Sequence, residues 1–178
     1  MAELLKDDKC RLITLVGPGG VGKTRLALEA AAQQGAAFRD GTAFIALASV
    51  NSRAAILPAV AGALGLSLYG SGDPEVQLLT FLRDKQMLLL VDNVEHLLEA
   101  AGLWVGLLQI ARTVKLLLTS REALNLQGEW VFEVEDCRFR RASRSRIWRR
   151  TRRRPCSSNG PAALASDLSC DRKTVRRW

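Results

Sequence analysis

The sequence predicts a doubly wound α/β fold, in which helices cover both faces of a parallel β-sheet. Two observations support this fold class. Five short apolar runs recur along the chain, and each is mostly uninterrupted, as is typical of strands that are buried on both faces of a sheet. Helical patterns separate these runs, and strands that alternate with helices indicate parallel β-α-β units.

The predicted elements follow one another in a regular order. The expected strands are LITLV, AFIAL, MLLLV, VKLLL and VFEV, at residues 12–16, 43–47, 87–91, 114–118 and 131–134. The expected helices lie at residues 23–34, 53–65, 74–84 and 94–111. Because crossovers between parallel strands are right-handed, the carboxyl ends of the strands meet at one edge of the sheet, where a ligand crevice is expected.

The alternation of strands and helices stops after Glu135, and the charge balance changes there as well. The chain of 178 residues carries a formal net charge of +8, but residues 138–178 contain 14 Lys and Arg against 2 Asp and Glu. Residues 1–137 contain 12 basic and 16 acidic residues, so this part is mildly acidic. The sequence predicts a folded domain at residues 1–136 and an Arg-rich, disordered tail at residues 137–178.

Cysteine usage and hydropathy exclude several classes of protein. The four cysteines and the single His96 have no metal-ligand spacing, so neither a zinc site nor a disulfide framework is expected. The first ten residues lack the apolar segment of a secretory signal. The longest apolar stretch, residues 103–118, contains Arg112 and Lys115 and is not expected to span a membrane. We therefore expect a cytoplasmic protein without a membrane partner.

The segment GPGGVGKT at residues 17–24 fits the phosphate-binding loop pattern G-x-x-x-x-G-K-[ST] and lies between a predicted strand and a predicted helix. Its glycines let backbone N–H groups wrap a polyphosphate, and the helix amino terminus favours an anion. Lys23 supplies a positive charge to the β- and γ-phosphates, and the Thr24 hydroxyl is a ligand for Mg²⁺. The alternative is a glycine-rich turn followed by an exposed lysine. The candidate nucleotide-binding residues are Gly17, Pro18, Gly19, Gly20, Val21, Gly22, Lys23, Thr24 and Arg25.

A carboxylate follows the predicted strand at residues 87–91. Asp92 at the end of this strand is expected beside the phosphates, where it holds the Mg²⁺ shell through water. The alternative is an ordinary Asp that caps the following helix. The presence of the phosphate-binding loop favours the metal role, so Thr24 and Asp92 are the predicted Mg²⁺ residues.

Two further charged residues are candidates at the same edge of the sheet. Arg121 follows the strand at residues 114–118 and can sense or neutralise a γ-phosphate, or it is a solvated loop arginine. A hydrolytic NTPase usually needs a carboxylate that orients the attacking water, and the position after Asp92 is Asn93 rather than Glu. Glu95 can serve in its place. Acidic residues are common in the first turn of a helix, however, where the helix dipole favours them. We favour this structural role for Glu95. The candidate catalytic residues are Lys23, Asp92, Glu95 and Arg121, whereas His96 either contacts nucleotide or serves only structure.

The blocks RLITLVGPGGVGKTRLALEAA, LLLVDNVEHLLEAAG and LLLTSREALNLQGEW, in this order, resemble the STAND class of P-loop ATPases. They are most similar to the NB-ARC-like ATPase modules of bacterial SARP- and LuxR-type transcriptional regulators, over about residues 4–135. The resemblance implies an ASCE-type P-loop NTPase sheet sandwiched by helices, with ATP and Mg²⁺ as cofactors. It implies that residues 17–24 bind phosphate, that Asp92 serves Mg²⁺ and that Arg121 is the sensor arginine.

The resemblance also implies a nucleotide-dependent switch. In this class, ATP binding and slow hydrolysis toggle the arrangement of neighbouring domains and gate an effector that is often DNA-binding. Members carry a VGRE-like segment before the first strand and a helical lid with a GxPLA-like motif after the last one. Neither motif occurs here, so we expect a fragment that lacks both ends of the module as well as the effector and sensor domains, with ATP and ADP as its ligands.

Ten arginines lie among residues 137–156, and two hypotheses for the tail stay open. In the first, the tail is a basic arm that binds nucleic acid through phosphates without sequence preference, and residues 163–178 resemble a helix-turn-helix. In the second, which we favour, the tail is an out-of-frame translation of the missing lid. Residues 155–161 and 171–178 can be encoded by codons that, in another reading frame, give amino-acid sequences similar to those of the family.

These observations predict the ATP-binding and slowly hydrolysing switch core of a bacterial signalling or transcription regulator. One alternative is a DNA-binding regulator whose residues 163–178 contact DNA. Another alternative is a module that binds nucleotide without turnover.

Overall fold

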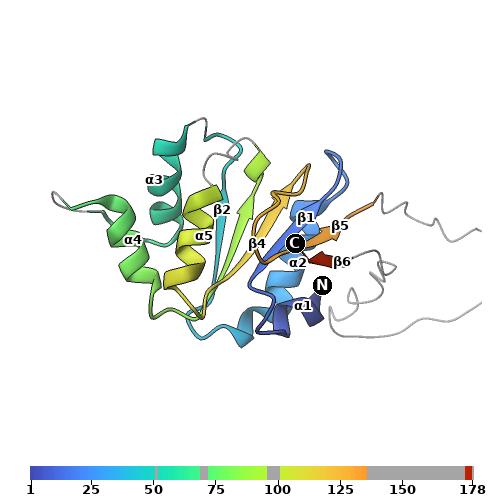
Figure 1. Cartoon of the computed structure of the whole chain (residues 1–178), viewed down its shortest axis with the longest axis horizontal. Helices are drawn as coiled ribbons and strands as arrows, with labels where there is room; N and C mark the ends of the chain where they lie inside the picture. Colours follow the sequence, from blue (N-terminus) through green and yellow to red (C-terminus); the bar gives the residue numbers. More distant parts are fainter. Residues whose placement is uncertain (51, 69–71, 96–100, 136–174, 178) are drawn as a thin grey trace, which may run out of the picture.

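The computed structural model describes residues 1–50, 52–68, 72–95, 101–135 and 175–177. A six-stranded sheet with the order β2-β3-β4-β1-β5-β6 forms its centre (Figure 1). Strands β1 to β5 are parallel, and β6 pairs with β5 in the antiparallel direction. The strands are β1 (Leu12–Val16), β2 (Thr42–Ala46), β3 (Leu88–Asp92), β4 (Lys115–Ser120), β5 (Glu129–Glu133) and β6 (Val175–Arg177). The predicted α/β fold with a parallel sheet is therefore confirmed.

Helices cover both faces of the sheet (Figure 1). Helices α3, α4 and α5 pack on one face, and α1 and α2 pack on the other. The described helices are α1 (Ala2–Lys6), α2 (Lys23–Gln34), the 3-10 helix η1 (Gly35–Ala37), α3 (Arg53–Ala63), α4 (Pro74–Leu82) and α5 (Ala101–Ile110). This arrangement gives the protein two hydrophobic cores, one on each side of the sheet.

Successive residues of a central strand contribute to opposite cores, as the pleat requires. In β3, Leu89 and Val91 join the core beneath α3, α4 and α5, whereas Leu88 and Leu90 join the core beneath α1 and α2. Each buried side chain of this size contributes about 1.5–3 kcal/mol to folding. Burial on both faces explains why the central strands read as continuous apolar runs. The edge strand β2 instead alternates between exposed and buried residues.

The boundary that differs most from prediction is the start of the helix expected at residues 94–111. Residues 94 and 95 lie in a short 3-10 turn, and α5 is described only from Ala101. Asn93 has a φ of 70°, in the left-handed region, so the chain changes direction directly after β3. Residues 96–100, including His96, lie outside the described residues.

Helix α1, which the sequence analysis did not predict, attaches the first residues to the sheet. The buried Leu5 packs into the core beneath α2. At the start of β4, the Lys115 Nζ atom donates hydrogen bonds of 2.8 Å to the carbonyl oxygens of Leu5 and Asp7. The Lys115 side chain is only 10% exposed, and this burial lowers its pKa. These contacts lie at the amino ends of the strands, so they leave the opposite edge free.

Three residues of the predicted tail join the sheet. Strand β6 pairs with residues 130–132 of β5. The helix-turn-helix alternative placed residues 175–177 in a basic helix, and this is wrong for these residues because they are extended and hydrogen-bonded to a strand. The domain boundary at residue 137, the disorder of the tail and its out-of-frame origin concern residues that lie mostly outside the described part of the chain, and they stay predictions.

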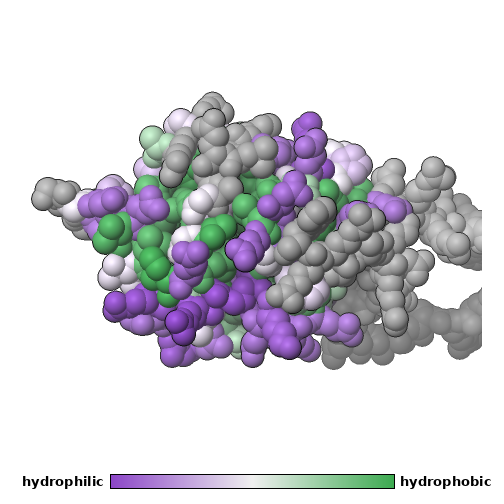
Figure 2. All heavy atoms as spheres, in the orientation of Figure 1, coloured by the Kyte–Doolittle hydropathy of each residue, from purple (hydrophilic) through white to green (hydrophobic). Residues whose placement is uncertain are grey.

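The surface of the described part is mixed in character. Figure 2 shows hydrophobic and hydrophilic residues side by side over the layer of α3, α4 and α5, with hydrophilic residues along the lower side of the view. Large apolar side chains are exposed at separate positions, which are Leu28, Phe44, Val76 and Ile110. None of the helices among the described residues combines the length and the apolar character needed to cross a bilayer.

Candidate nucleotide-binding site

The site begins at the carboxyl end of β1, where a loop of residues 17–22 leads into α2. Gly20 and Gly22 have φ angles of 79° and 95°, which other residues rarely adopt. Gly22 is the N-cap of α2 and has no side chain that could occupy the first N–H groups of the helix. These groups and the positive end of the helix dipole are therefore available to an anion.

Gly17 fixes this loop against the end of β5. A Cβ atom at Gly17 would collide with the carbonyl oxygen of Val134, and it would also approach a methyl group of Val21 to 3.4 Å. Val134 in turn donates a backbone hydrogen bond of 2.7 Å to Val16, the last residue of β1. The first glycine of the loop is therefore required by close packing between backbone segments rather than by a positive φ.

Lys23 lies at the start of α2 and curls back over the loop. Its Nζ atom donates hydrogen bonds to the carbonyl oxygens of Gly17, at 2.7 Å, and Pro18, at 2.9 Å. The ammonium group is thus held over the first two residues of the loop. This position is suited to a phosphate group, which offers stronger acceptors than the two carbonyl oxygens.

The carboxylate of Asp92 connects three elements of the site. Its Oδ1 atom accepts hydrogen bonds from the hydroxyl groups of Thr24, at 2.7 Å, and Thr119, at 2.6 Å. Thr119 also accepts a hydrogen bond of 2.9 Å from the backbone N–H of Asn93. The carboxylate therefore joins the first turn of α2 to β4 through two hydroxyl groups, and its metal role stays a prediction.

The sequence places Thr119 at the same edge of the sheet as Arg121 but indicates no role for it. It is 2% exposed and lies on β4, next to β3 in the sheet. The available signal was its position at the polar end of the run at residues 114–118, because β3 and β4 end at the same edge. Sequence alone does not say that its hydroxyl turns toward Asp92.

Arg121 and Glu95 form an ion pair beside the loop. The Arg121 Nε atom lies 3.1 Å from Glu95 Oε1. Another nitrogen of the same guanidinium, Nη2, lies 3.9 Å from the position that a Cβ atom of Gly19 would take. The structure therefore places Arg121 beside the phosphate-binding loop and pairs it with Glu95, although the two residues are 26 positions apart in the sequence.

The remaining predicted residues of the loop have different surroundings. Pro18 and Arg25 are exposed, as are Gly19 and Gly20. Val21 packs partly against the core beneath α1 and α2. All members of the predicted set at residues 17–25, together with Asp92, Glu95 and Arg121, thus lie at or next to the carboxyl edge of the sheet.

The connection from β4 to β5 contains no helix and depends on a buried carboxylate. Glu129 is fully buried, and its two oxygens accept hydrogen bonds of 3.1 Å from the backbone N–H groups of Leu124 and Leu126. Both leucines pack against the core beneath α3, α4 and α5. Glu129 thus supplies the hydrogen-bond partners that a helix or a strand would otherwise give to this segment. Its position in the sequence does not indicate this role.

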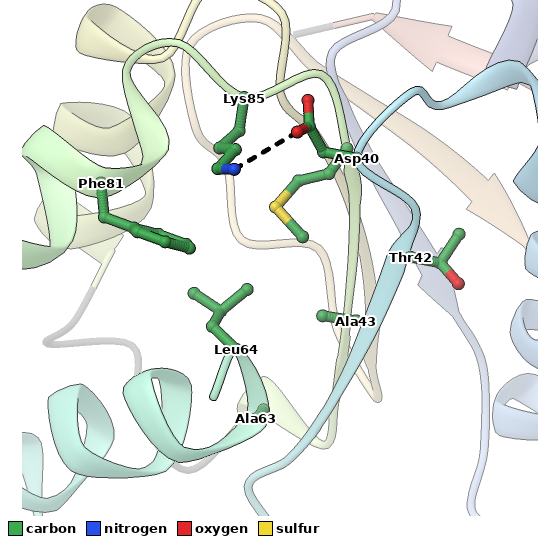
Figure 3. A pocket seen from close by; sticks show the side chains of 8 residues that line it. Asp40, Thr42, Ala43, Ala63, Leu64, Phe81 and Lys85 are labelled. Carbon is green, nitrogen blue, oxygen red and sulfur yellow. Dashed lines mark hydrogen bonds and ion pairs between the residues drawn. The ribbon is translucent and has the colours of Figure 1, made fainter. Parts of the chain in front are cut away.

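A small pocket of about 230 Å³ lies near the amino ends of β2 and β3. At this pocket, the Lys85 Nζ atom lies 3.3 Å from Asp40 Oδ1 and 5.1 Å from the centre of the Phe81 ring (Figure 3). A hydrogen bond from the backbone N–H of Gln86 lowers the pKa of Asp40. The charges of this pocket already neutralise each other, and it is remote from the residues described above.

The fold and the sequence are similar to those of known proteins. Residues 6–126 match the family described as the AAA domain. A Mycobacterium tuberculosis protein, provisionally named as an HTH-type transcriptional regulator, is 39% identical over 125 residues, which cover 70% of this chain and 14% of that protein. An uncharacterised protein of the same organism is 38% identical over 131 residues, which cover 73% of this chain and 33% of that protein.

The chain thus spans between about a seventh and a third of the length of these relatives. A chain in the structure of Drosophila ORC bound to DNA has a TM-score of 0.58 and 20% sequence identity, and the alignment covers 75% of this chain and 40% of that one. This likeness concerns the fold alone. Because residues 6–126 form more than half of the chain, the protein belongs to the AAA domain family and contains an AAA-type ATPase domain.

Proposed function

We propose that this chain is the ATP-binding switch core of a STAND-type, NB-ARC-like ATPase from a bacterial transcription regulator of the SARP or LuxR type. The observation that supports this proposal best is the convergence of four groups at the carboxyl edge of the sheet. The loop with its available N–H groups, the Lys23 ammonium, the hydrogen-bonded pair of Thr24 and Asp92, and the Arg121 guanidinium belong to different segments of the chain.

The donor chemistry fits Mg-ATP. Mg²⁺ prefers hard oxygen ligands, and the Thr24 hydroxyl and the Asp92 carboxylate lie 2.7 Å apart at the end of the loop. In the loaded protein Thr24 would bind the metal directly and Asp92 would hold its water shell. Bound Mg²⁺ neutralises charge that develops on the β- and γ-phosphates. The chain itself supplies the loop N–H groups and Lys23 to bind the phosphates, and Arg121 to contact the terminal one.

Two versions of this function differ in turnover. In the first, Glu95 orients a water molecule and the domain hydrolyses ATP slowly. In the second, the domain binds nucleotide without turnover, because Asn93 occupies the position next to Asp92. The Glu95 Oε2 atom is buried and accepts no hydrogen bond from the described residues, so a phosphate-release assay decides between the two versions.

The role in transcription is supported by the relatives. One relative carries the name of an HTH-type transcriptional regulator, and it is about seven times longer than the matched segment. We therefore assign the effector and sensor functions to domains outside this chain. We also expect the protein to lie in the cytoplasm. The alternative of DNA binding through residues 163–178 predicts specificity that survives high salt, whereas a polycationic tail predicts uniform loss of binding with salt.

Titration calorimetry of the chain with Mg-ATP tests the proposal directly. We expect a one-to-one complex, and slow release of phosphate in a parallel assay would distinguish the hydrolysing version from the binding-only version. Mg-GTP serves as the competitor that tests base preference. A folded sample that takes up neither nucleotide would refute the proposed function.

Replacing Thr119 with valine is expected to weaken Mg-ATP binding through Asp92. Valine keeps the shape of the side chain but gives Asp92 no donor and leaves the partly buried N–H of Asn93 without an acceptor. We expect a loss of about 1–3 kcal/mol in unfolding free energy. Because second-shell partners tune metal sites, we also expect about tenfold weaker binding at limiting Mg²⁺. Calorimetric titrations at several Mg²⁺ concentrations measure the second effect.

Thr14 provides the matched control for this prediction. It is a buried threonine on the neighbouring strand β1, and its hydroxyl has no hydrogen-bond partner among the described residues. Thr14→Val should therefore be neutral or stabilising. Thr119→Ser retains the hydroxyl and should restore the Mg²⁺ dependence. Equal effects of Thr14→Val and Thr119→Val would show that Thr119 acts only by packing.

A further inference from the structure

Glu95 and Arg121 differ strongly in their exposure to solvent. The Glu95 side chain is 12% exposed, whereas the Arg121 side chain is 65% exposed. The Glu95 Oε2 atom is buried without a described hydrogen-bond donor, so Arg121 is the charged partner that the described residues offer to this carboxylate. A carboxylate that has lost most of its water depends on such a partner. The pair therefore restrains an arginine that would otherwise move freely in solvent.

The way in which the two residues meet leaves part of the guanidinium available. Glu95 contacts Arg121 through Nε, which is the nitrogen nearest to the backbone. The terminal nitrogen Nη2 lies over Gly19 of the phosphate-binding loop. An arginine has five N–H donors in a rigid plane, so an interaction at Nε fixes where the terminal nitrogens point. Glu95 thus contacts the guanidinium at Nε, and the loop lies near its terminal nitrogen Nη2.

We propose that Glu95 is a positioning residue, which holds Arg121 over the phosphate-binding loop and thereby sets the preference for a nucleoside triphosphate over a diphosphate. This inference rests on the proposed function of the site. A terminal phosphate above Gly19 meets a guanidinium that is already oriented, so less side-chain entropy is lost on binding. A diphosphate ends before Arg121 and gains nothing from this orientation.

Binding of ADP and of a non-hydrolysable ATP analogue to Glu95→Ala tests the proposal. We expect affinity for the analogue to fall roughly 3- to 10-fold, as for a charge-assisted contact that is partly exposed. Affinity for ADP should stay within about twofold of the wild-type value, because ADP lacks the terminal phosphate that Arg121 would contact. In an Arg121→Ala background the Glu95→Ala change should lose its effect on the analogue, because the two residues act as a unit. Glu122→Ala removes an exposed carboxylate next to Arg121 and serves as the matched control.

Several results would overturn the proposal. Simple charge repulsion by Glu95 predicts stronger binding of the analogue in Glu95→Ala, and it predicts the same gain without Arg121. A water-orienting role predicts that Glu95→Gln loses phosphate release while the ratio of analogue to ADP affinity stays unchanged. The positioning role instead predicts that Glu95→Gln lowers that ratio, since a neutral amide no longer forms the ion pair that orients Arg121. Wild-type protein that binds neither nucleotide would instead refute the proposed function itself.

Discussion

Replacing Lys23 with alanine is expected to weaken Mg-ATP binding at least 100-fold. In the structure the Nζ atom lies above the loop and is held by the carbonyl oxygens of Gly17 and Pro18. These are neutral acceptors, so exchanging them for a phosphate group strengthens each hydrogen bond. The variant loses this gain and leaves the phosphates facing loop carbonyl oxygens without a cation. A 100-fold loss of affinity corresponds to about 2.7 kcal/mol.

The effect of Lys23→Ala is measured by titration calorimetry, with thermal unfolding in the absence of nucleotide as the test of folding. Lys9→Ala removes the same charge from an exposed position near the start of β1, at the amino edge of the sheet, and should bind Mg-ATP like the wild type. If Lys23→Ala kept the wild-type affinity, the ATP site would have to be sought elsewhere. A uniform effect of both lysine variants would indicate non-specific attraction by net charge.

The sheet could be predicted because its signal is local and strong. Strands such as β3 are buried on both faces, so their sequences are apolar throughout, and helical patterns separate them. The phosphate-binding loop is also a local signal, since all its groups lie within eight consecutive residues. The predicted carboxyl-edge location of Asp92 and Arg121 followed from the rule that parallel strands end at one edge.

The contacts that organise the site could not be predicted, because they join residues far apart in the sequence. The hydroxyl of Thr119 meets Asp92 across 27 positions, and Glu95 meets Arg121 across 26 positions. Neither side-chain direction is encoded by a periodic pattern. The short helix α1 was missed for a related reason, because its end is completed by Lys115 from a distant strand.

Replacing Gly17 with alanine is expected to lower the free energy of unfolding by about 3 kcal/mol, at the upper end of the range for overpacked sites. The new methyl group would collide with a backbone carbonyl oxygen of Val134, which cannot rotate away as a side chain does. Val134 is also hydrogen-bonded to Val16, so moving it breaks the register of β5 on β1. For a domain of this size the change corresponds to a fall in Tm of roughly 10 °C, measured by circular dichroism.

Gly19→Ala separates this collision from the general cost of removing a glycine. A Cβ atom at Gly19 would meet its nearest neighbour, Arg121 Nη2, at 3.9 Å, which is an ordinary van der Waals contact. We therefore expect the Tm of Gly19→Ala to stay close to that of the wild type, although both glycines belong to one loop. If Gly17→Ala were equally stable, the loop could not pack against the end of β5. The position of Lys23 would then lose its support, because its Nζ atom is held by the Gly17 carbonyl oxygen.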